Sequence, residues 1–424
     1  MRSRYSPPER GFQVVVAASD ATDKAKRVAD YVCDGTADQE EIQAAIDATA
    51  STGGQVRLSA GNFAISAAIE MTHAVGLIGS GDNASILRAI DDIEDNVVEY
   101  CPTTAGGFAN LRDLEIIGHA EGTVGHGIYM CDDGEAPPVG DPRDWTIDRV
   151  YIRECAQDGI HITANWGGKI TNCISETNEG KGAYLTGGTQ TFVKGSFFAY
   201  NKGDYGVQIA TPDCQFLHNY VFRNEKSGMY VAGDNNVLVG NKFLSNGCET
   251  ASTTNTHSNL ILWASATYGT VIVGNNFNGV YGGKNTKYDI YINQAVNNII
   301  TGNSFETIGT THIYDPLGTG QIIGNNVGAD DTVKASVAIS PAGKTSIDTT
   351  NGALALSLKD GTTLGQFCEI VMTVDGGHDA TLTIAHHATD DAETATFADV
   401  DDRLILQWEG THWNTWQNTG VVFP

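Results

Sequence analysis

The chain has 424 residues with 51 acidic and 25 basic side chains, and its net charge of −26 repels a phosphate backbone, which excludes nucleic-acid binding. No apolar run is long enough to span a bilayer and the N-terminus lacks the apolar stretch of a secretory signal, so we expect no membrane insertion and no such signal. The acidity is spread along the chain, a pattern typical of halophilic proteins and also of ordinary acidic secreted or phage proteins.

In chain order, the sequence first predicts a strand at residues 12–18 and then a charged, mobile stretch at residues 19–27. A short helix follows, because Thr36 or Asp38 can act as its N-cap and acidic residues occupy its first turn. The strand, the mobile segment and this capping helix make up an N-terminal region over residues 1–60. The helix has one apolar face, formed by Ile42, Ala45 and Ile46.

From Gly127 onward a short phrase keeps returning: a small or polar residue, then an apolar, a variable and an apolar residue. Its copies start 22 to 32 residues apart, a period typical of solenoids, whose units bury their apolar faces only by stacking. A second phrase, apolar-Gly-Asn, repeats out of phase with the first. We therefore predict a parallel β-helix over residues 61–330, with two short strands per turn, Gly or Asn at the corners, and stacked Asn ladders. The first phrase starts at Gly127, Gly159, Gly182, Gly206, Gly228, Asn259 and Asp289, and the second is aligned on Val239, Val273, Thr301 and Ile323.

The residues that lead into the coil resemble a known superfamily. Asp34-Gly-Thr36 is followed by Ile42-Gln-Ala-Ala-Ile-Asp47 and by Gly53-Gly-Gln-Val-Arg-Leu58. This succession resembles the start of the pectate-lyase-like right-handed β-helix superfamily, and it is most similar to phage tailspike and other virion-associated β-helix proteins. The resemblance covers residues 28–330 and implies a right-handed coil whose open end is capped by the helix. Because the superfamily includes lyases, hydrolases, epimerases and non-catalytic spikes, it implies a fold and leaves the activity open.

Residues 331–424 change character, because apolar and polar residues alternate between turns that contain Asp-Gly or Glu-Gly. We predict a small antiparallel β domain of the sandwich or jelly-roll type, which makes the whole chain all-β. The strings Asp360–Gln366 and Leu406–Trp413 are similar to C-terminal modules of phage virion proteins, which favours a particle component. The core of this domain is expected to contain Trp408, Trp413 and Trp416.

Strand alternation in the first phrase sends both apolar residues inward and the variable residue outward. The outward residues therefore form a stripe that contains four tyrosines and one histidine. Exposed aromatic rows stack on sugar faces and also form subunit interfaces, and tyrosine is common in strands for its β-propensity alone, so three explanations stay open. The stripe consists of Tyr129, His161, Tyr184, Gln208, Tyr230, Ile261 and Tyr291.

Glycan cleavage requires paired carboxylates, or a base beside a metal ion or an arginine. Four carboxylates near coil corners are candidates for such a pair, although corners also carry Asp for turn formation alone. Gly125-His126-Gly127 resembles a tripeptide of polygalacturonases, but that family's Asn-Thr-Asp and Arg-Ile-Lys elements are missing, so we treat the match as coincidence. The catalytic candidates are Asp158, Glu176, Glu179 and Asp204.

An acidic, Pro-rich loop after Cys131 offers oxygen ligands of the kind that Ca²⁺ prefers, although most such loops are simply solvated. No other cofactor is implied by the sequence. The candidate Ca²⁺ ligands are Asp132, Asp133 and Glu135.

The eight cysteines contain no CxxC pair, which argues against a zinc site. Cys155 and Cys173 lie in or beside predicted strands and are best explained as small buried hydrophobic residues. Disulfides stay open, because an even count in a long chain without a secretion signal carries no weight.

The leading hypothesis is a virion structural appendage, a spike, turret or fibre that projects from a viral particle and binds host surface glycans. It would form a homo-oligomer, a trimer or, at a capsid vertex, a pentamer, and would contact other virion proteins and a host polysaccharide or glycoprotein. The alternative is a polysaccharide-degrading lyase or glycoside hydrolase of the tailspike depolymerase type, so enzymatic activity stays open. The expected location is the virion, with an extracellular location as the alternative.

Overall fold

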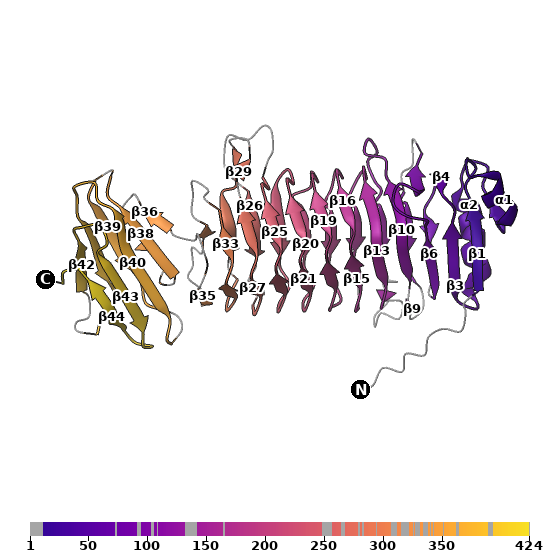
Figure 1. The fold of residues 1–424 in the computed structure, drawn as a ribbon. Coiled ribbons are helices and arrows are strands. Elements are labelled where there is room, and N and C mark those ends of the chain that lie inside the picture. The colour runs from indigo at the N-terminus through magenta and orange to yellow at the C-terminus, as the bar shows by residue number, and fades with distance from the viewer. Residues whose placement is uncertain are drawn as a thin grey trace. The chain divides into compact units, whose positions relative to one another are not determined.

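The computed structural model (Figure 1) describes residues 12–423 with the exception of several short segments. The described chain is almost entirely β-structure, and neither of its two helices has the length and hydrophobicity of a transmembrane span. It divides into two compact units, residues 1–230 and residues 231–424. The segments that are not described within this range are residues 73, 91–94, 103–105, 108, 132–141, 164–165, 248–256, 264–267, 279, 282–283, 294, 307–311, 315–321, 325, 327–330, 334–337, 340, 342, 351, 362–363 and 389–392.

The N-terminal unit starts with parallel strands. β1 (Phe12–Ala17) pairs in parallel with β2 (Tyr31–Val32) and with β3 (Gly54–Leu58), and β3 pairs in parallel with β6 (Val75–Ile78). The parallel ladder therefore begins before Gly61, the position at which we expected the first coil.

Helix α2 (Gln39–Ala50) packs against β1 and β3 at this end of the coil (Figure 1), and the three apolar residues predicted for its inner face are all buried. Its N-cap is Asp38, whose carboxylate accepts hydrogen bonds from the backbone N–H groups of Gly35 (2.7 Å) and Ala64 (2.8 Å). The second of these bonds links the start of the helix to the strand that contains Ala64. The stretch predicted to be mobile instead contains a second helix, α1 (Asp23–Val28), because the Thr22 side chain caps its first turn.

The coils of the N-terminal unit form three ladders rather than the two that the sequence predicted, and in two of the coils one long strand serves both the first and the second ladder. The second repeated phrase spans a corner between two strands, since its central glycine adopts a left-handed backbone, as at Gly240 (φ 65°) and Gly274 (φ 64°); Asn172 (φ 55°) and Gly195 (φ 64°) adopt the same backbone in the N-terminal unit. Inward side chains of all three ladders are buried, so the core fills the interior of the coil. The first ladder contains β3, β6, β10 (Asn110–Ile117), β13 (Thr146–Arg153), β15 (Lys169–Thr171), β18 (Phe192–Lys194) and β21 (Gln215–Leu217). The second ladder contains β4 (Gly61–Ile65), β7 (Ser85–Ala89), the ends of β10 and β13, β16 (Ile174–Glu176), β19 (Phe197–Ala199) and β22 (Tyr220–Phe222). The third ladder contains β5 (Ile69–Glu70), β8 (Val98–Tyr100), β11 (Ile128–Met130), β14 (Ile160–Ile162), β17 (Ala183–Leu185), β20 (Tyr205–Ile209) and β23 (Ser227–Val231), and β9 (Gly106–Gly107) pairs separately with β12 (Pro142–Arg143).

The predicted asparagine ladders are present in both units. In the N-terminal unit Asn178 donates to Asn201 (2.8 Å) and Asn201 to Asn224 (3.0 Å), and all three are fully buried. In the C-terminal unit a ladder of the same kind runs through neighbouring coils with Nδ2–Oδ1 distances of 2.9, 3.0 and 3.1 Å. Each side-chain amide hydrogen-bonds to the amide at the equivalent corner of the next coil, so the buried polar groups of the turns have partners and the turns are stabilised. This second ladder consists of Asn241, Asn275, Asn303 and Asn326.

The coils of the C-terminal unit also form three ladders. The alignment predicted for the last coil is wrong by one residue, because Ile323 pairs with Ile300 and not with Thr301. That register places Asn326 on the asparagine ladder. The strands are β24 (Val237–Val239), β27 (Val271–Val273), β32 (Ile299–Thr301) and β35 (Ile322–Gly324) in the first ladder; β25 (Lys242–Leu244), β28 (Asn276–Asn278) and β33 (Ser304–Phe305) in the second; β26 (Ser258–Trp263), β31 (Tyr288–Asn293) and β34 (Ile313–Tyr314) in the third; and β29 (Val280–Tyr281) with β30 (Lys284–Asn285) in an antiparallel pair.

The C-terminal part of the chain forms two sheets around one apolar core, as predicted. Its pairing is mixed, since β36, β38 and β40 are parallel and only the later partners are antiparallel. Trp408 and Trp413 lie in the core, but Trp416 does not: it is 68% exposed and contacts Phe367 edge-on. One sheet has β36 (Asp331–Val333), β38 (Gly343–Asp348), β40 (Phe367–Val374), β43 (Arg403–Trp408) and β44 (Trp413–Thr419), and the other has β37 (Ala338–Ile339), β39 (Leu354–Leu358), β41 (Ala380–Ile384) and β42 (Glu393–Phe397).

One disulfide lies in the described residues and joins neighbouring coils. It links Cys101, after β8, to Cys131, after β11, with a Cα–Cα distance of 4.7 Å. Cys155 and Cys173 are buried free thiols, as predicted, and burial raises the pKa of each to about 12, so both stay protonated and unreactive.

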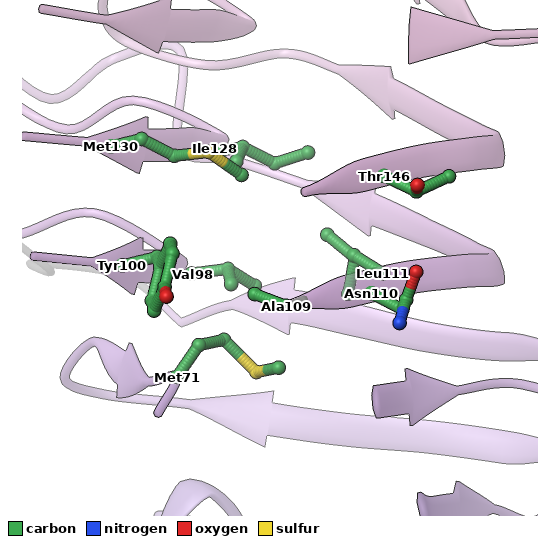
Figure 2. Close-up of a pocket in the computed structure, with 9 residues that line it drawn as sticks. All are labelled: Met71, Val98, Tyr100, Ala109, Asn110, Leu111, Ile128, Met130 and Thr146. Atoms are coloured by element: carbon green, nitrogen blue, oxygen red, sulfur yellow. The ribbon is translucent and has the colours of Figure 1, made fainter. Parts of the chain in front are cut away.

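The interior next to this disulfide contains a void of about 10 Å³, roughly the space of one water molecule. Figure 2 shows its lining, in which Ile128 and Met130 of β11 point into the coil. The intervening Tyr129 is half-exposed, in keeping with strand alternation. Tyr100 also lines the void, and burial raises the pKa of its hydroxyl to about 12.

Candidate functional site

The predicted outward stripe is in register along the third ladder of the N-terminal unit. Tyr129 pairs with His161, His161 with Tyr184, and Tyr184 with Gln208. The residues on either side of each stripe residue along its strand are buried, so all four side chains face outward. The ladder also places Glu99 next to Tyr129, a neighbour that the sequence analysis did not include.

His161 lies at the centre of an aromatic group on this face. Its ring centre is 5.4 Å from that of Tyr129 and 4.8 Å from that of Tyr184. The Lys181 ammonium lies 4.9 Å from the centre of the Tyr184 ring, a cation–π contact that keeps a positive charge at the site. His126, from the turn before β11, approaches to 4.3 Å between ring centres.

Asp158 holds the histidine in place. Its Oδ2 atom is 2.8 Å from Nδ1 of His161, and its Oδ1 atom accepts a hydrogen bond of 2.7 Å from the Lys181 N–H. Burial pushes the pKa of this carboxyl upward, but the His161 hydrogen bond and the Lys181 charge outweigh burial, and the pKa lies below its ordinary value. An ionised Asp158 must accept, so Nδ1 of His161 carries the proton and Nε2 is left as a base.

The corner that carries Asp158 is tight. Gly159 follows it, and a Cβ at this position would overlap with the Ser175 hydroxyl and the Asn178 amide. The small residue of the repeated phrase is therefore needed for close packing, and it lets the preceding carboxylate reach the Lys181 N–H of the next coil.

His126 is fixed as a neutral imidazole. The His126 backbone N–H donates to Asn96 Oδ1 (2.9 Å), and the ring Nδ1 accepts from the Asp158 backbone N–H (3.1 Å). Burial lowers the pKa of His126 to about 4. At neutral pH the ring is therefore an uncharged acceptor beside Asp158.

A shallow pocket of about 300 Å³ opens over these rings. Its wall includes both histidines and Tyr129, so their chemistry is accessible to a ligand. One ligand atom each from His126, Asp158 and His161 also lies within 4.8 Å of the other two, a spacing that a metal ion can bridge. The pocket is lined by Asp95, Asn96, Val124, Gly125, His126, Tyr129, Gln157 and His161.

The other predicted catalytic carboxylates each have a partner of their own. Glu176 accepts from the Tyr151 hydroxyl (2.5 Å) on the second ladder. Glu179 pairs with Lys202 (2.5 Å), and Asp204 with Lys226 (2.6 Å), both at exposed positions. Only Asp158, among the four candidates, lies in the histidine cluster. The predicted Ca²⁺ ligands Asp132, Asp133 and Glu135 lie outside the described residues.

The remaining stripe residues lie among other tyrosines. Tyr230 stacks on Tyr205 with ring centres 4.5 Å apart in the N-terminal unit. In the C-terminal unit Ile261 pairs with Tyr291 and Tyr291 with Tyr314, whose ring stacks on Tyr288 at 4.4 Å. These rows offer flat aromatic faces of the kind that stack on sugars or on a partner protein.

Sequence reasoning missed His126 and Lys181. His126 belongs to the tripeptide that we treated as coincidence, although it lies 32 residues before Asp158, within the range of the repeat spacing. One coil therefore separates the two, and the repeat period was the signal that could have brought them together. Lys181 stands directly before a phrase start, so its contact with the Asp158 corner follows from the same period.

A family model described as right handed beta helix region matches residues 103–265. The fold is thus the right-handed parallel β-helix, and the predicted superfamily resemblance is confirmed at the level of the fold.

Many solved structures share this fold. The Dettilon tailspike protein (gp208) has a TM-score of 0.53 at 15% identity, with coverage of 93% of this chain and 78% of that one. DFA-IIIase from Arthrobacter chlorophenolicus has a TM-score of 0.51 at 12% identity, with coverage of 74% and 94%.

One curated protein is similar in sequence. Alginate lyase 7 of Azotobacter vinelandii is 27% identical over 197 residues, which cover 42% of this chain. The match spans 22% of that lyase, about a fifth of its length.

Proposed function

We propose that the cluster of His126, Asp158 and His161, with Tyr129 and Tyr184, is a polysaccharide-cleaving site that acts by β-elimination on uronic-acid-containing chains. The observation that carries the proposal is the oriented Asp158–His161 pair, held between two tyrosines at the edge of an open pocket. The aromatic rings would stack on sugar faces and hold the chain along the ladder.

Elimination fits these residues better than hydrolysis does. A glycoside hydrolase needs two carboxyl groups, one of which is protonated to act as the acid. Asp158 has its pKa held below the ordinary range, so it stays ionised. Histidine as base and tyrosine as acid are instead the groups that a proton abstraction beside a carboxylate requires.

The step balances with groups that the cluster supplies. Nε2 of His161 takes the proton from C5 of the uronate, and the charge that develops on its carboxylate is stabilised by the Lys181 ammonium. The C4–O bond then breaks, a C4–C5 double bond forms, and the phenol of Tyr129 or Tyr184 protonates the departing oxygen. Asp158 keeps His161 in the productive tautomer throughout, an orienting role that leaves it ionised.

The sequence similarity to an alginate lyase supports this substrate class, because alginate is a polyuronate. Purified protein is expected to release unsaturated oligosaccharides from polyuronates, detected by the ultraviolet absorbance of the new double bond. His161→Ala should lower the rate by about 10²–10⁴-fold, whereas Tyr291→Phe, on the stripe of the C-terminal unit, should leave it unchanged. Inactivity of the unmodified protein toward a broad panel of polyuronates would overturn the proposal.

A second proposal concerns where this site works: we infer that the chain is an appendage of a viral particle that binds host surface glycans as a homo-oligomer. The likeness to the Dettilon tailspike, which extends over 93% of this chain, supports it. Antibodies against the protein are expected to decorate purified virions of the host's viruses, and light scattering should give a multiple of the 45.0 kDa chain mass. A monomer that is absent from particles would contradict this inference.

A further inference from the structure

We propose that His126, Asp158 and His161 form a binding site for a transition-metal dication of the Zn²⁺ class, and that the bound ion switches the site off. The metal site itself is independent of the proposed elimination, while its inhibitory effect rests on that proposed function.

The ligand atoms converge on one carboxylate oxygen. Oδ2 of Asp158 is 2.8 Å from Nδ1 of His161 and 4.0 Å from Nδ1 of His126. A tetrahedral Zn²⁺ with bonds of about 2.0–2.2 Å needs ligand atoms about 3.4 Å apart. The two observed distances lie on either side of this value, and all three ligand atoms lie within 4.8 Å of one another, so small side-chain shifts would complete the geometry.

The three ligands are well supported and only slightly exposed. The exposed side-chain fractions are 13% for His126, 8% for Asp158 and 17% for His161. The second carboxylate oxygen of Asp158 is tied to the Lys181 N–H, the kind of outer contact that orients metal ligands. The pocket above His126 and His161 leaves a fourth position for water.

The ligand set selects the metal. Two imidazoles and one carboxylate suit zinc, cobalt, nickel or iron, whereas Ca²⁺ and Mg²⁺ prefer oxygen ligands throughout. The ion would replace the weak hydrogen bond from the Asp158 N–H to His126 at 3.1 Å, and the Lys181 charge nearby opposes it. Both costs reduce the affinity, which favours reversible binding.

Metal binding removes the base. In the free site the His161 proton is on Nδ1 and Nε2 is unprotonated. A metal on Nδ1 moves this proton to Nε2, because a neutral imidazole carries only one proton. No proton is gained or lost in the exchange, but the nitrogen that would take the substrate proton is now occupied.

The test measures binding without substrate. Calorimetry with ZnCl₂ should give one site per chain whose affinity falls at least about tenfold in His126→Ala and in His161→Ala. His378→Ala, at an exposed histidine in the connection between β40 and β41, is the matched control and should bind as the unmodified protein does. Co²⁺ added to the unmodified protein should give the visible absorption bands of a tetrahedral complex, a readout that does not depend on how the variants fold.

Each outcome decides the proposal. Equal Zn²⁺ affinity in the two cluster variants and in the control would overturn the metal site, and so would an octahedral Co²⁺ spectrum. If Zn²⁺ binds at the cluster but fails to inhibit an active enzyme, the switch is wrong and the site stands. Loss of activity with Zn²⁺ and its return with a chelator is the expected result.

Discussion

The two units close the same corner of the coil in different ways. In the N-terminal unit the repeated phrase starts with glycine, and the space beside it is filled by a buried asparagine from the corner of the next coil, as Asn224 fills the space beside Gly206. In the C-terminal unit the phrase starts with Asn259 and Asp289, which form a buried chain themselves: Asn259 donates to Asp289 (2.7 Å), and Asp289 contacts His312 (2.6 Å). The same backbone repeat therefore accommodates two different arrangements of buried polar side chains at this corner.

The difference decides which Asp–His pair is available for chemistry. Asp158 and His161 lie on one coil, and His161 keeps 17% of its side chain exposed beside the pocket. Asp289 and His312 lie on neighbouring coils with exposed fractions of 0% and 6%. Burial raises the pKa of Asp289, and its hydrogen bonds only partly offset this effect. At the proposed site, glycine at the start of the phrase leaves the corner to the asparagine ladder, and the carboxylate precedes the glycine by one position, where its histidine partner stays partly exposed.

The largest effect is expected from the carboxylates. Asp158→Asn should lower the elimination rate by about 10³–10⁴-fold, because the amide can still accept from the Lys181 N–H but no longer fixes the His161 tautomer. Asp289→Asn, the same change in the buried pair, should leave the rate unchanged. Initial rates on polyuronate distinguish the two, and an equal loss in both would show that the exposed pair has no special role.

Reciprocal exchange of the corner residues should destabilise both units. Gly206→Asn forces a side chain into space held by Asn224, and Asn259→Gly leaves the Asp289 carboxylate short of a donor. Each change should cost about 1–3 kcal/mol of unfolding free energy, from overpacking in the first and an unsatisfied buried group in the second. Urea denaturation of both variants tests this, and a neutral effect of Gly206→Asn would mean that the corner has room.

The two aspartates should give opposite pH dependence of stability. The pKa of Asp158 lies below the unfolded value of about 3.9, so its contribution is present above that pH and is lost as the pH falls through the folded pKa. The pKa of Asp289 lies above the unfolded value, so its contribution is full below about pH 3.9 and is lost as the pH rises through the folded pKa.

Compared with the parent, Asp158→Asn should therefore become more destabilising as the pH rises, and Asp289→Asn less so. Urea unfolding between about pH 3.5 and 7, on either side of the unfolded carboxyl pKa, measures both slopes. Slopes of the same sign would contradict the assigned pKa directions.

The smallest effect is expected at the exposed corner carboxylates. Glu179→Gln breaks only its ion pair with Lys202, whose side chain is 51% exposed, so the unfolding free energy should change by less than about 1 kcal/mol. The elimination rate should not change. A rate loss comparable to that of Asp158→Asn would restore the predicted pairing of carboxylates and would argue for hydrolysis.

The sequence alone determined the β-helix, the buried asparagine ladders and the outward stripe, because these depend on a repeat period and on strand alternation, which are local properties of the chain. It also singled out Asp158, His161, Tyr129 and Tyr184. Only the tertiary structure showed three ladders, because a single left-handed residue is enough to bend one apparent strand into two.

The tertiary structure also decided which polar residues work together. His126 and Asp158 are separated by 32 residues, and their contact exists because one coil stacks on the next. Glu176, Glu179 and Asp204 looked equivalent to Asp158 in the sequence, but the exact rotation of each corner sends them to different partners. Periodicity fixes which coil a residue occupies, whereas the direction of its side chain depends on packing against neighbours that the period does not specify.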